Sequence, residues 1–133
     1  MSLFISYAQT DRSYAQELSQ ALRSRGFEVF RDDETLIADE NYADLILDAL
    51  KNAELVVFVV PKDNGDGKNA LFEVGAAKAL GKRIFAIMPH GRTSAGRDVA
   101  LGLADLIFMD VSETQPDRIA DIVERALDRR ALH

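Results

Sequence analysis

Strand and helix patterns alternate along the whole chain, and this alternation limits the fold more than any other feature. Short apolar runs such as Leu3 to Tyr7 and Ile84 to Met88 have the length and composition of strands. Longer segments between them carry apolar residues at helical spacing, for example Tyr42, Leu45, Ile46, Ala49 and Leu50. Repeated strand–helix units in 133 residues predict a parallel sheet with helices on both faces.

One strand of this sheet should lie in its interior. Leu55 to Val60 is an unbroken apolar run that ends at Pro61, a pattern typical of a parallel strand buried on both faces. Right-handed crossovers restrict the remaining topologies. We expect an α/β fold, a flavodoxin-like doubly wound sheet of five parallel strands in the order 2-1-3-4-5, forming a single domain over residues 1–133.

The expected topology also predicts where a ligand binds. In open parallel sheets, ligands lie beyond the carboxyl ends of the strands, at the point where the strand order reverses. Here this point falls between the first and third strands. The residues expected around it are 7–10, 61–69 and the first turn of the helix that follows, with the loop 31–42 overhanging them.

Glu73 is the polar side chain that stands out at this position. It is the single charged residue in Ala70 to Ala77, and a charge in apolar surroundings is costly unless it is solvated, paired or used. We expect it to open into a crevice beside residues 7–9. The alternative is a solvated carboxylate that stabilises the helix dipole. Ser6 ends the first strand without a neighbouring base in the sequence.

Composition excludes several classes of function. The chain has no cysteine and two histidines, His90 and His133, so thiolate sites, a histidine-built metal centre and a thiol nucleophile are not expected. A net charge of −6 argues against binding to nucleic acid or to an anionic membrane surface. No apolar run has the length of a membrane span, and no basic segment precedes Leu3. We therefore expect a cytoplasmic protein whose first strand begins at a true N-terminus.

The chain resembles a Toll/interleukin-receptor (TIR) domain of bacterial type over nearly its whole length. The resemblance is carried by the first strand and its exit, by the second strand entering the following loop, and by the third helix. The matching residues are Phe4 to Tyr7 with Asp11, Gly26 to Asp32, Ile46 to Ala53 before the Leu55 to Val60 run, and Asn69, Phe72, Glu73, Gly75 and Ala77 with Leu80 to Lys82.

This resemblance implies cleavage of NAD, in a role in bacterial defence or signalling. NAD is then the substrate, no cofactor is needed, and the catalytic glutamate of the family falls on Glu73. The implied substrate-binding residues are Tyr7, Ala8 and Gln9 after the first strand, Asp32 and Tyr42 at the ends of the BB loop, and Asn69 and Phe72 beside Glu73. The family also implies self-association through TIR–TIR contacts.

The sequence departs from the family in the BB loop. Asp39 stands where a glycine is usual, and Tyr42 stands where tryptophan is common. Two other functions stay open: a non-catalytic module that only associates with other TIR domains, and a nucleoside deoxyribosyltransferase, whose glutamate also acts on an N-glycosidic bond. The product of NAD cleavage, linear or cyclic, stays open as well.

Overall fold

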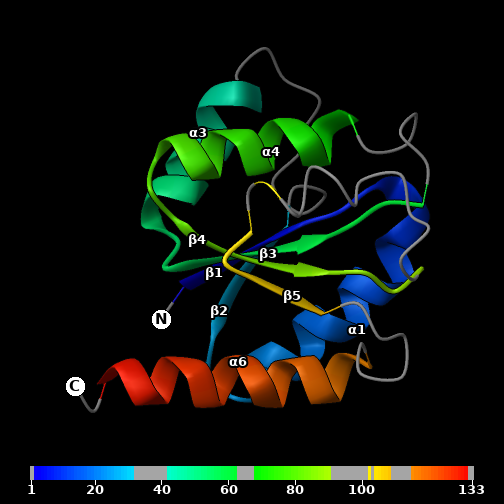
Figure 1. Cartoon of the computed structure of the whole chain (residues 1–133), viewed down its shortest axis with the longest axis vertical. Helices are drawn as coiled ribbons and strands as arrows, with labels where there is room; N and C mark the ends of the chain where they lie inside the picture. The colour runs from blue at the N-terminus through cyan, green and yellow to red at the C-terminus, as the bar shows by residue number, and fades with distance from the viewer. Residues whose placement is uncertain are drawn as a thin grey trace.

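The computed structural model describes residues 2–31, 42–62, 68–90, 102, 104–108 and 115–131. The five strands are β1 (Ser2–Ser6), β2 (Glu28–Arg31), β3 (Leu55–Val59), β4 (Arg83–Ile87) and β5 (Leu106–Phe108). The helices are η1 (Gln9–Asp11), α1 (Arg12–Arg23), α3 (Tyr42–Asn52), α4 (Lys68–Ala79) and α6 (Pro116–Ala131). They form three layers, with α3 and α4 on one face of the sheet and α1 and α6 on the other (Figure 1).

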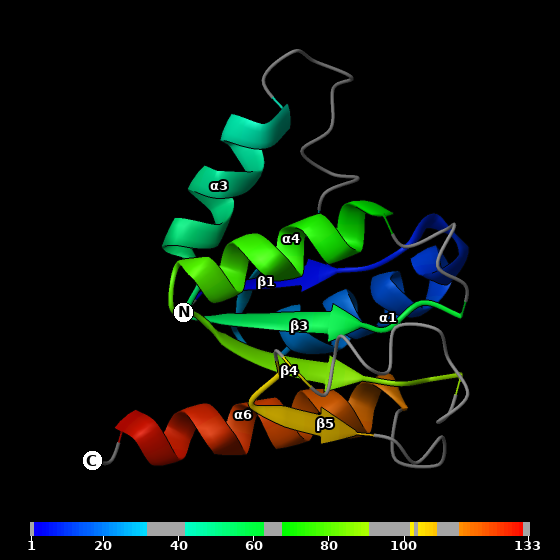
Figure 2. The ribbon, with the colours of Figure 1, turned by 45° about the horizontal axis from the view of Figure 1, so that its top comes forward.

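The sheet is parallel throughout. Its strand order is β2-β1-β3-β4-β5, and every neighbouring pair runs in the same direction. Figure 2 shows β1, β3, β4 and β5 with their arrows pointing the same way. The predicted α/β class and the parallel order of the four longer strands are confirmed, and the three-residue strand β5 pairs with β4. Residues 55–60 are all fully buried, as the apolar run predicted, because helices cover both faces of β3.

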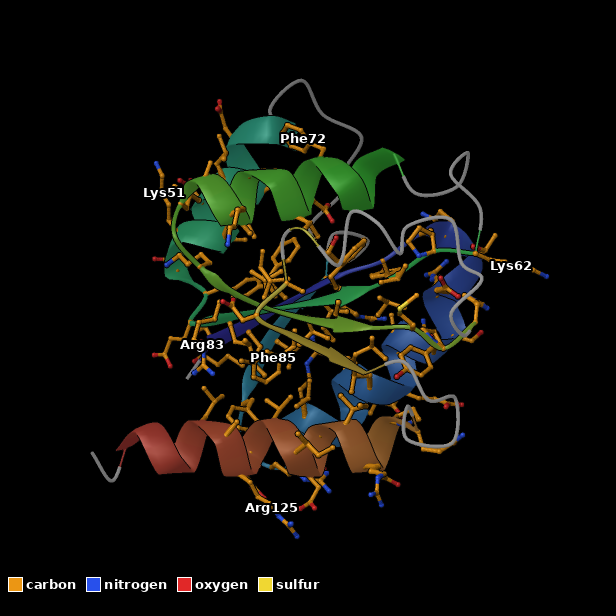
Figure 3. All side chains as sticks on the ribbon, in the orientation of Figure 1. Lys51, Lys62, Phe72, Arg83, Phe85 and Arg125 are labelled. Atoms are coloured by element: carbon orange, nitrogen blue, oxygen red, sulfur yellow. The ribbon has the colours of Figure 1, made fainter. Side chains whose placement is uncertain are left out.

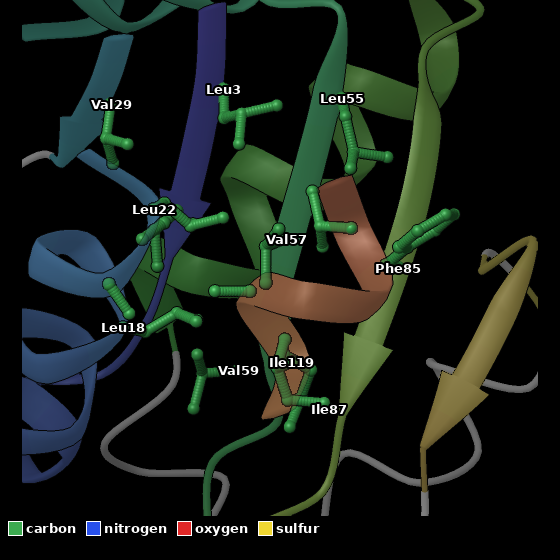
Figure 4. Close-up of a cluster of buried hydrophobic side chains, with 14 of the residues drawn as sticks. Leu3, Leu18, Leu22, Val29, Leu55, Val57, Val59, Phe85, Ile87 and Ile119 are labelled. Atoms are coloured by element: carbon green, nitrogen blue, oxygen red, sulfur yellow. The ribbon is translucent and has the colours of Figure 1, made fainter. Parts of the chain in front are cut away.

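Alternation along the strands divides the core into two clusters, one on each face. Leu3 and Ile5 of β1 face α1 and α6, whereas Phe4 faces α3 and α4. The cluster under α1 and α6 is drawn in Figure 4 and includes Leu18, Leu22, Val57, Phe85 and Ile119. Because side chains alternate in direction along a strand, Ser6 lies on the same side of β1 as Phe4.

Two glycines end helices as the sequence indicated. Gly26 follows α1 with φ +90°, and Gly81 follows α4 with φ +73°. A side chain would be strained at these angles, so glycine allows each helix to stop and the chain to turn into the next strand. These turns precede β2, which is an edge strand, and β4, which lies beside β3.

One predicted core position is wrong. Leu45 belongs to the apolar stripe expected to face inward on α3, but its side chain is 42% exposed. Ile46, Ala49 and Leu50 are buried and cover the sheet without it. The stripe of apolar residues is therefore wider than the face that α3 buries, and Leu45 lies on the outer surface.

Ser19 generates a first prediction. It lies on α1 with 1% exposure, and its hydroxyl oxygen has no hydrogen-bond partner in the part of the chain that the structure describes. Ser19→Ala removes this buried polar group and improves helix propensity, so the free energy of unfolding in urea should rise by about 1 kcal/mol. The exposed Ser13→Ala shares only the propensity gain and should change stability less. A lower unfolding midpoint for Ser19→Ala would contradict the assignment.

Candidate functional site

The carboxyl end of β1 lies at the point where the strand order reverses. Ser6 is the last residue of β1 and pairs in register with Phe58 of β3. From β1 the chain runs outward to β2 and then returns to β3 on the other side of β1. This is the position where open parallel sheets bind ligands, because the loops after the two strands separate there.

Glu73 reaches this position from α4. The helix packs on the sheet through Val74 and Ala77, which are fully buried, and Glu73 lies in the same buried part of the helix with 0% exposure. Its Oε1 accepts a hydrogen bond of 2.8 Å from the Ser6 hydroxyl, which is also fully buried. Two residues 67 positions apart in the sequence thus form one polar contact inside an apolar layer.

The burial of Glu73 corrects one expectation. We expected this carboxylate to open into a crevice, but its side chain has no exposed surface. The alternative of a solvated, dipole-stabilising glutamate is excluded by the same burial. An ionised carboxylate removed from water is costly, and a donated hydrogen bond offsets part of that cost by stabilising the negative charge.

The predicted substrate-binding loop after β1 divides between the two faces. Tyr7 is 3% exposed and belongs to the cluster under α1 and α6, so its ring lies on the opposite side of the sheet from Glu73. Ala8 is buried as well, and Gln9 is exposed at the start of η1. The structure therefore brings Ser6, and not the ring of Tyr7, to Glu73.

The other predicted residues are spread over different surroundings. Phe72 is 47% exposed and points away from the sheet on the outer side of α4 (Figure 3). Tyr42 and Asn69 lie in the first turns of α3 and α4, and their side chains are outside the described part of the structure. Asp32 lies outside the described residues altogether.

Ser6 is the residue that sequence reasoning missed. It was set aside because no base neighbours it in the sequence, and Glu73 becomes its neighbour only through the fold. The available signal was the alternation along β1, which places Ser6 on the same face as Phe4. A helix after β3 that covered this face would bring its inward residues over Ser6.

A second polar pair lies on the other face of the sheet. Asp11 is the last residue of η1 and the N-cap of α1, is 5% exposed, and contacts His90, the third residue after β4 ends at Ile87. The distance from Asp11 Oδ1 to His90 Nε2 is 2.6 Å, and Asp11 Oδ2 has no partner among the described residues. Asp11 holds the N-cap position of α1 without a side-chain cap bond. Burial raises the pKa of Tyr14, and the charge of Asp11 adds to this effect.

Other parts of the described structure offer fewer groups for binding or catalysis. A surface hollow of about 460 Å³ lies between α1 and the start of α6, lined by polar groups such as Glu17, Gln20 and Asp117. It lies on the face opposite to Glu73. The described residues contain no group of three or more metal-ligating side chains. None of the helices among them combines the length and apolarity needed to cross a bilayer.

The Asp11–His90 pair generates a prediction about stability. His90→Ala leaves a buried carboxylate without its donor, so the free energy of unfolding in urea should fall by about 1–3 kcal/mol. In the double variant Asp11→Asn with His90→Ala, the loss should be smaller than the sum of the single losses, because the charge is also removed. Strictly additive losses would show that the pair contributes no coupling.

Comparison with known proteins identifies the family. The sequence model of the TIR domain matches residues 3–127. Curated proteins gave no match. Among solved structures, a chain from the crystal structure of the RPS4 and RRS1 TIR domain heterodimer is similar at 16% identity, with a TM-score of 0.64. The match covers 100% of this chain and 100% of that chain.

Two further structures share the fold. A 2-deoxyribosyltransferase from Bacillus psychrosaccharolyticus is similar at 17% identity and a TM-score of 0.68, covering 86% of this chain and 90% of its own. The CMP N-glycosidase BcmB from Clostridium botulinum gives the same identity and TM-score, covering 92% and 99%. With the family match spanning residues 3–127 and a parallel α/β sheet whose switch point holds a buried glutamate, the chain belongs to the TIR domain family.

Proposed function

We propose that this TIR domain cleaves the bond between nicotinamide and ribose in NAD, with Glu73 as the catalytic residue. The observation that carries the proposal is the buried Ser6–Glu73 contact at the reversal of strand order. A fully buried carboxylate where the strand order reverses is a common sign of a functional group, because burying a charge costs the fold free energy. The fold shared with a deoxyribosyltransferase and an N-glycosidase adds support.

The chemistry needs few groups from the protein. In NAD the nicotinamide is already cationic, so the bond from C1′ of ribose to the ring nitrogen can break without protonation of the leaving group. The electron pair goes to nicotinamide, and positive charge develops on the ribose. A single fixed carboxylate stabilises that charge electrostatically, which is the largest contribution in many enzymes. Neither a second carboxylate nor a metal ion is required by this mechanism.

Two acceptors can complete the reaction. Attack of water on C1′ gives ADP-ribose and releases one proton, whereas attack by another part of the same dinucleotide gives a cyclic product.

We propose that the backbone at 7–9, which follows Ser6 directly, borders the substrate. Asp32, Tyr42, Asn69 and Phe72 stay in the proposed binding set on the strength of the family resemblance.

The burial of Glu73 means that the site has to open before a substrate can bind. A substrate can contact this carboxylate only if the groups that cover it move, because its side chain has no exposed surface. We propose that association with a second copy of the chain brings about this movement. Among the described residues, the exposed large apolar side chains are those of Leu45 on α3, Phe72 within α4 and Leu80 directly after α4. We propose that these side chains, on or directly after two helices that contact each other, form the contact with the second copy.

Glu73→Gln tests the catalytic role. The amide keeps the shape of the side chain and removes its charge, so nicotinamide release from NAD should fall roughly 100-fold or more. The measurement is chromatography of free nicotinamide after incubation of purified protein with NAD. Glu54→Gln, which changes an exposed glutamate, is the matched control and should retain full activity. Unchanged turnover in a folded Glu73→Gln variant would remove Glu73 from the mechanism.

The dependence on association is a separate prediction. Specific activity should rise with protein concentration, and a fused dimerisation tag should raise it at low concentration. Leu45→Ser should shift this rise to higher concentration and leave thermal stability nearly unchanged, since Leu45 is outside the core. A specific activity that stays constant over a hundredfold dilution of a monomeric protein would show that one copy is sufficient.

A second candidate function follows from the same glutamate. The likeness to a deoxyribosyltransferase and to a CMP N-glycosidase favours action on a nucleoside or nucleotide. Supplying a deoxynucleoside with a free base, or CMP alone, in place of NAD distinguishes these reactions by their products. A protein that is inactive with all three and still pairs with other TIR domains would be an interaction module.

A further inference from the structure

We infer that Ser6 is a positioning residue for Glu73: its hydroxyl holds the carboxylate in one orientation and stabilises its charge for the reaction. This inference rests on the proposed function of Glu73. It concerns a residue that the family resemblance did not single out. Ser6 would act on the substrate only through Glu73, so it is not itself a catalytic residue.

The surroundings of Ser6 show why a hydroxyl there needs an explanation. On its face of the sheet, the neighbouring inward side chains are apolar, including Phe4, Val56 and Phe58. An apolar residue at this position would continue the core, whereas a buried hydroxyl has to find a partner. That partner is Glu73 Oε1, at 2.8 Å, with both residues at 0% exposure.

Both residues are held by the most constrained parts of the fold. Ser6 ends a strand that pairs with β2 on one side and β3 on the other. Glu73 lies next to Val74, which is anchored in the core together with Ala77. A loop movement alone therefore displaces neither backbone. When the site opens, we expect the covering groups to move while the Ser6–Glu73 contact persists.

A Ser6–Glu73 contact that persists in the open site would keep the carboxylate oriented for catalysis. A carboxylate that is already oriented costs no reorganisation when positive charge develops on the ribose. Serine has one torsion between heavy atoms, χ1, so its Oγ can take only three staggered positions once the strand is in place. A contact that opened before catalysis would instead act as a latch, and its loss would raise activity.

The experiment measures steady-state nicotinamide release by Ser6→Ala and Ser6→Cys, under the clustered conditions that activate the wild-type protein. The cysteine variant is nearly isosteric and replaces a strong donor with a weak one, so it covers the case in which alanine disturbs folding. We expect kcat to fall roughly 10- to 100-fold in each folded variant, with KM within about threefold of wild type, since a hydrogen bond to a charged group is lost. Ser6→Thr retains a hydroxyl and should recover part of the kcat.

The other end of the same strand offers a matched control. Ser2 Oγ donates a hydrogen bond of 3.1 Å to Glu28 Oε2 at the surface. Ser2→Ala therefore also removes a serine–glutamate hydrogen bond from β1, and it should leave kcat and KM unchanged.

The possible results separate the two claims. Absence of nicotinamide release by clustered wild-type protein overturns the proposed function and, with it, the role of Ser6. If the wild type is active, a kcat within twofold of wild type in the Ser6 variants overturns the positioning role alone. A raised kcat overturns it too, because the contact would then be a latch. An equal change in Ser2→Ala would show that the effect is not specific to Glu73.

Discussion

The burial of β3 on both faces is the constraint on which the rest of this structure depends. Because all residues from 55 to 60 are removed from water, helices must cover the sheet above and below. The pairs α3–α4 and α1–α6 supply these layers. The same requirement packs α4 on the sheet at the end of β1. There the helix places the Glu73 carboxylate beside Ser6, among mostly apolar side chains.

That carboxylate is stable because its surroundings are rigid and provide a donor. Ser6 and Glu73 are joined by one hydrogen bond between a central strand and a helix anchored in the core. Close packing leaves such a pair little room to rearrange. A group held this firmly is suited to electrostatic catalysis, in which the protein stabilises developing charge without moving.

The sheet separates two polar contacts that both lie near the carboxyl ends of the strands. Ser6 and Glu73 lie under α4, whereas Asp11 and His90 lie on the side of α1. The first pair is the reaction centre that we propose, because its buried carboxylate lies where the strand order reverses. The Asp11–His90 pair joins the chain after β1 to His90 after β4, and so it holds the loop that we propose as part of the substrate site. A deoxyribosyltransferase and an N-glycosidase have similar folds.

The amino-acid sequence alone was enough to predict the α/β class, the parallel order of the longer strands and the buried β3, and it made Glu73 the candidate catalytic residue. These follow from local signals: apolar periodicity, the glycines that end helices, and one charge in an apolar run. Only the tertiary structure decided that Glu73 is buried and meets Ser6, that Tyr7 faces the opposite layer, and that Asp11 pairs with His90. The two contacts depend on which elements pack together, because they join residues 67 and 79 positions apart in the sequence. Local periodicity shows which face of an element is apolar, but the packing of one element on another decides which polar side chains meet between them.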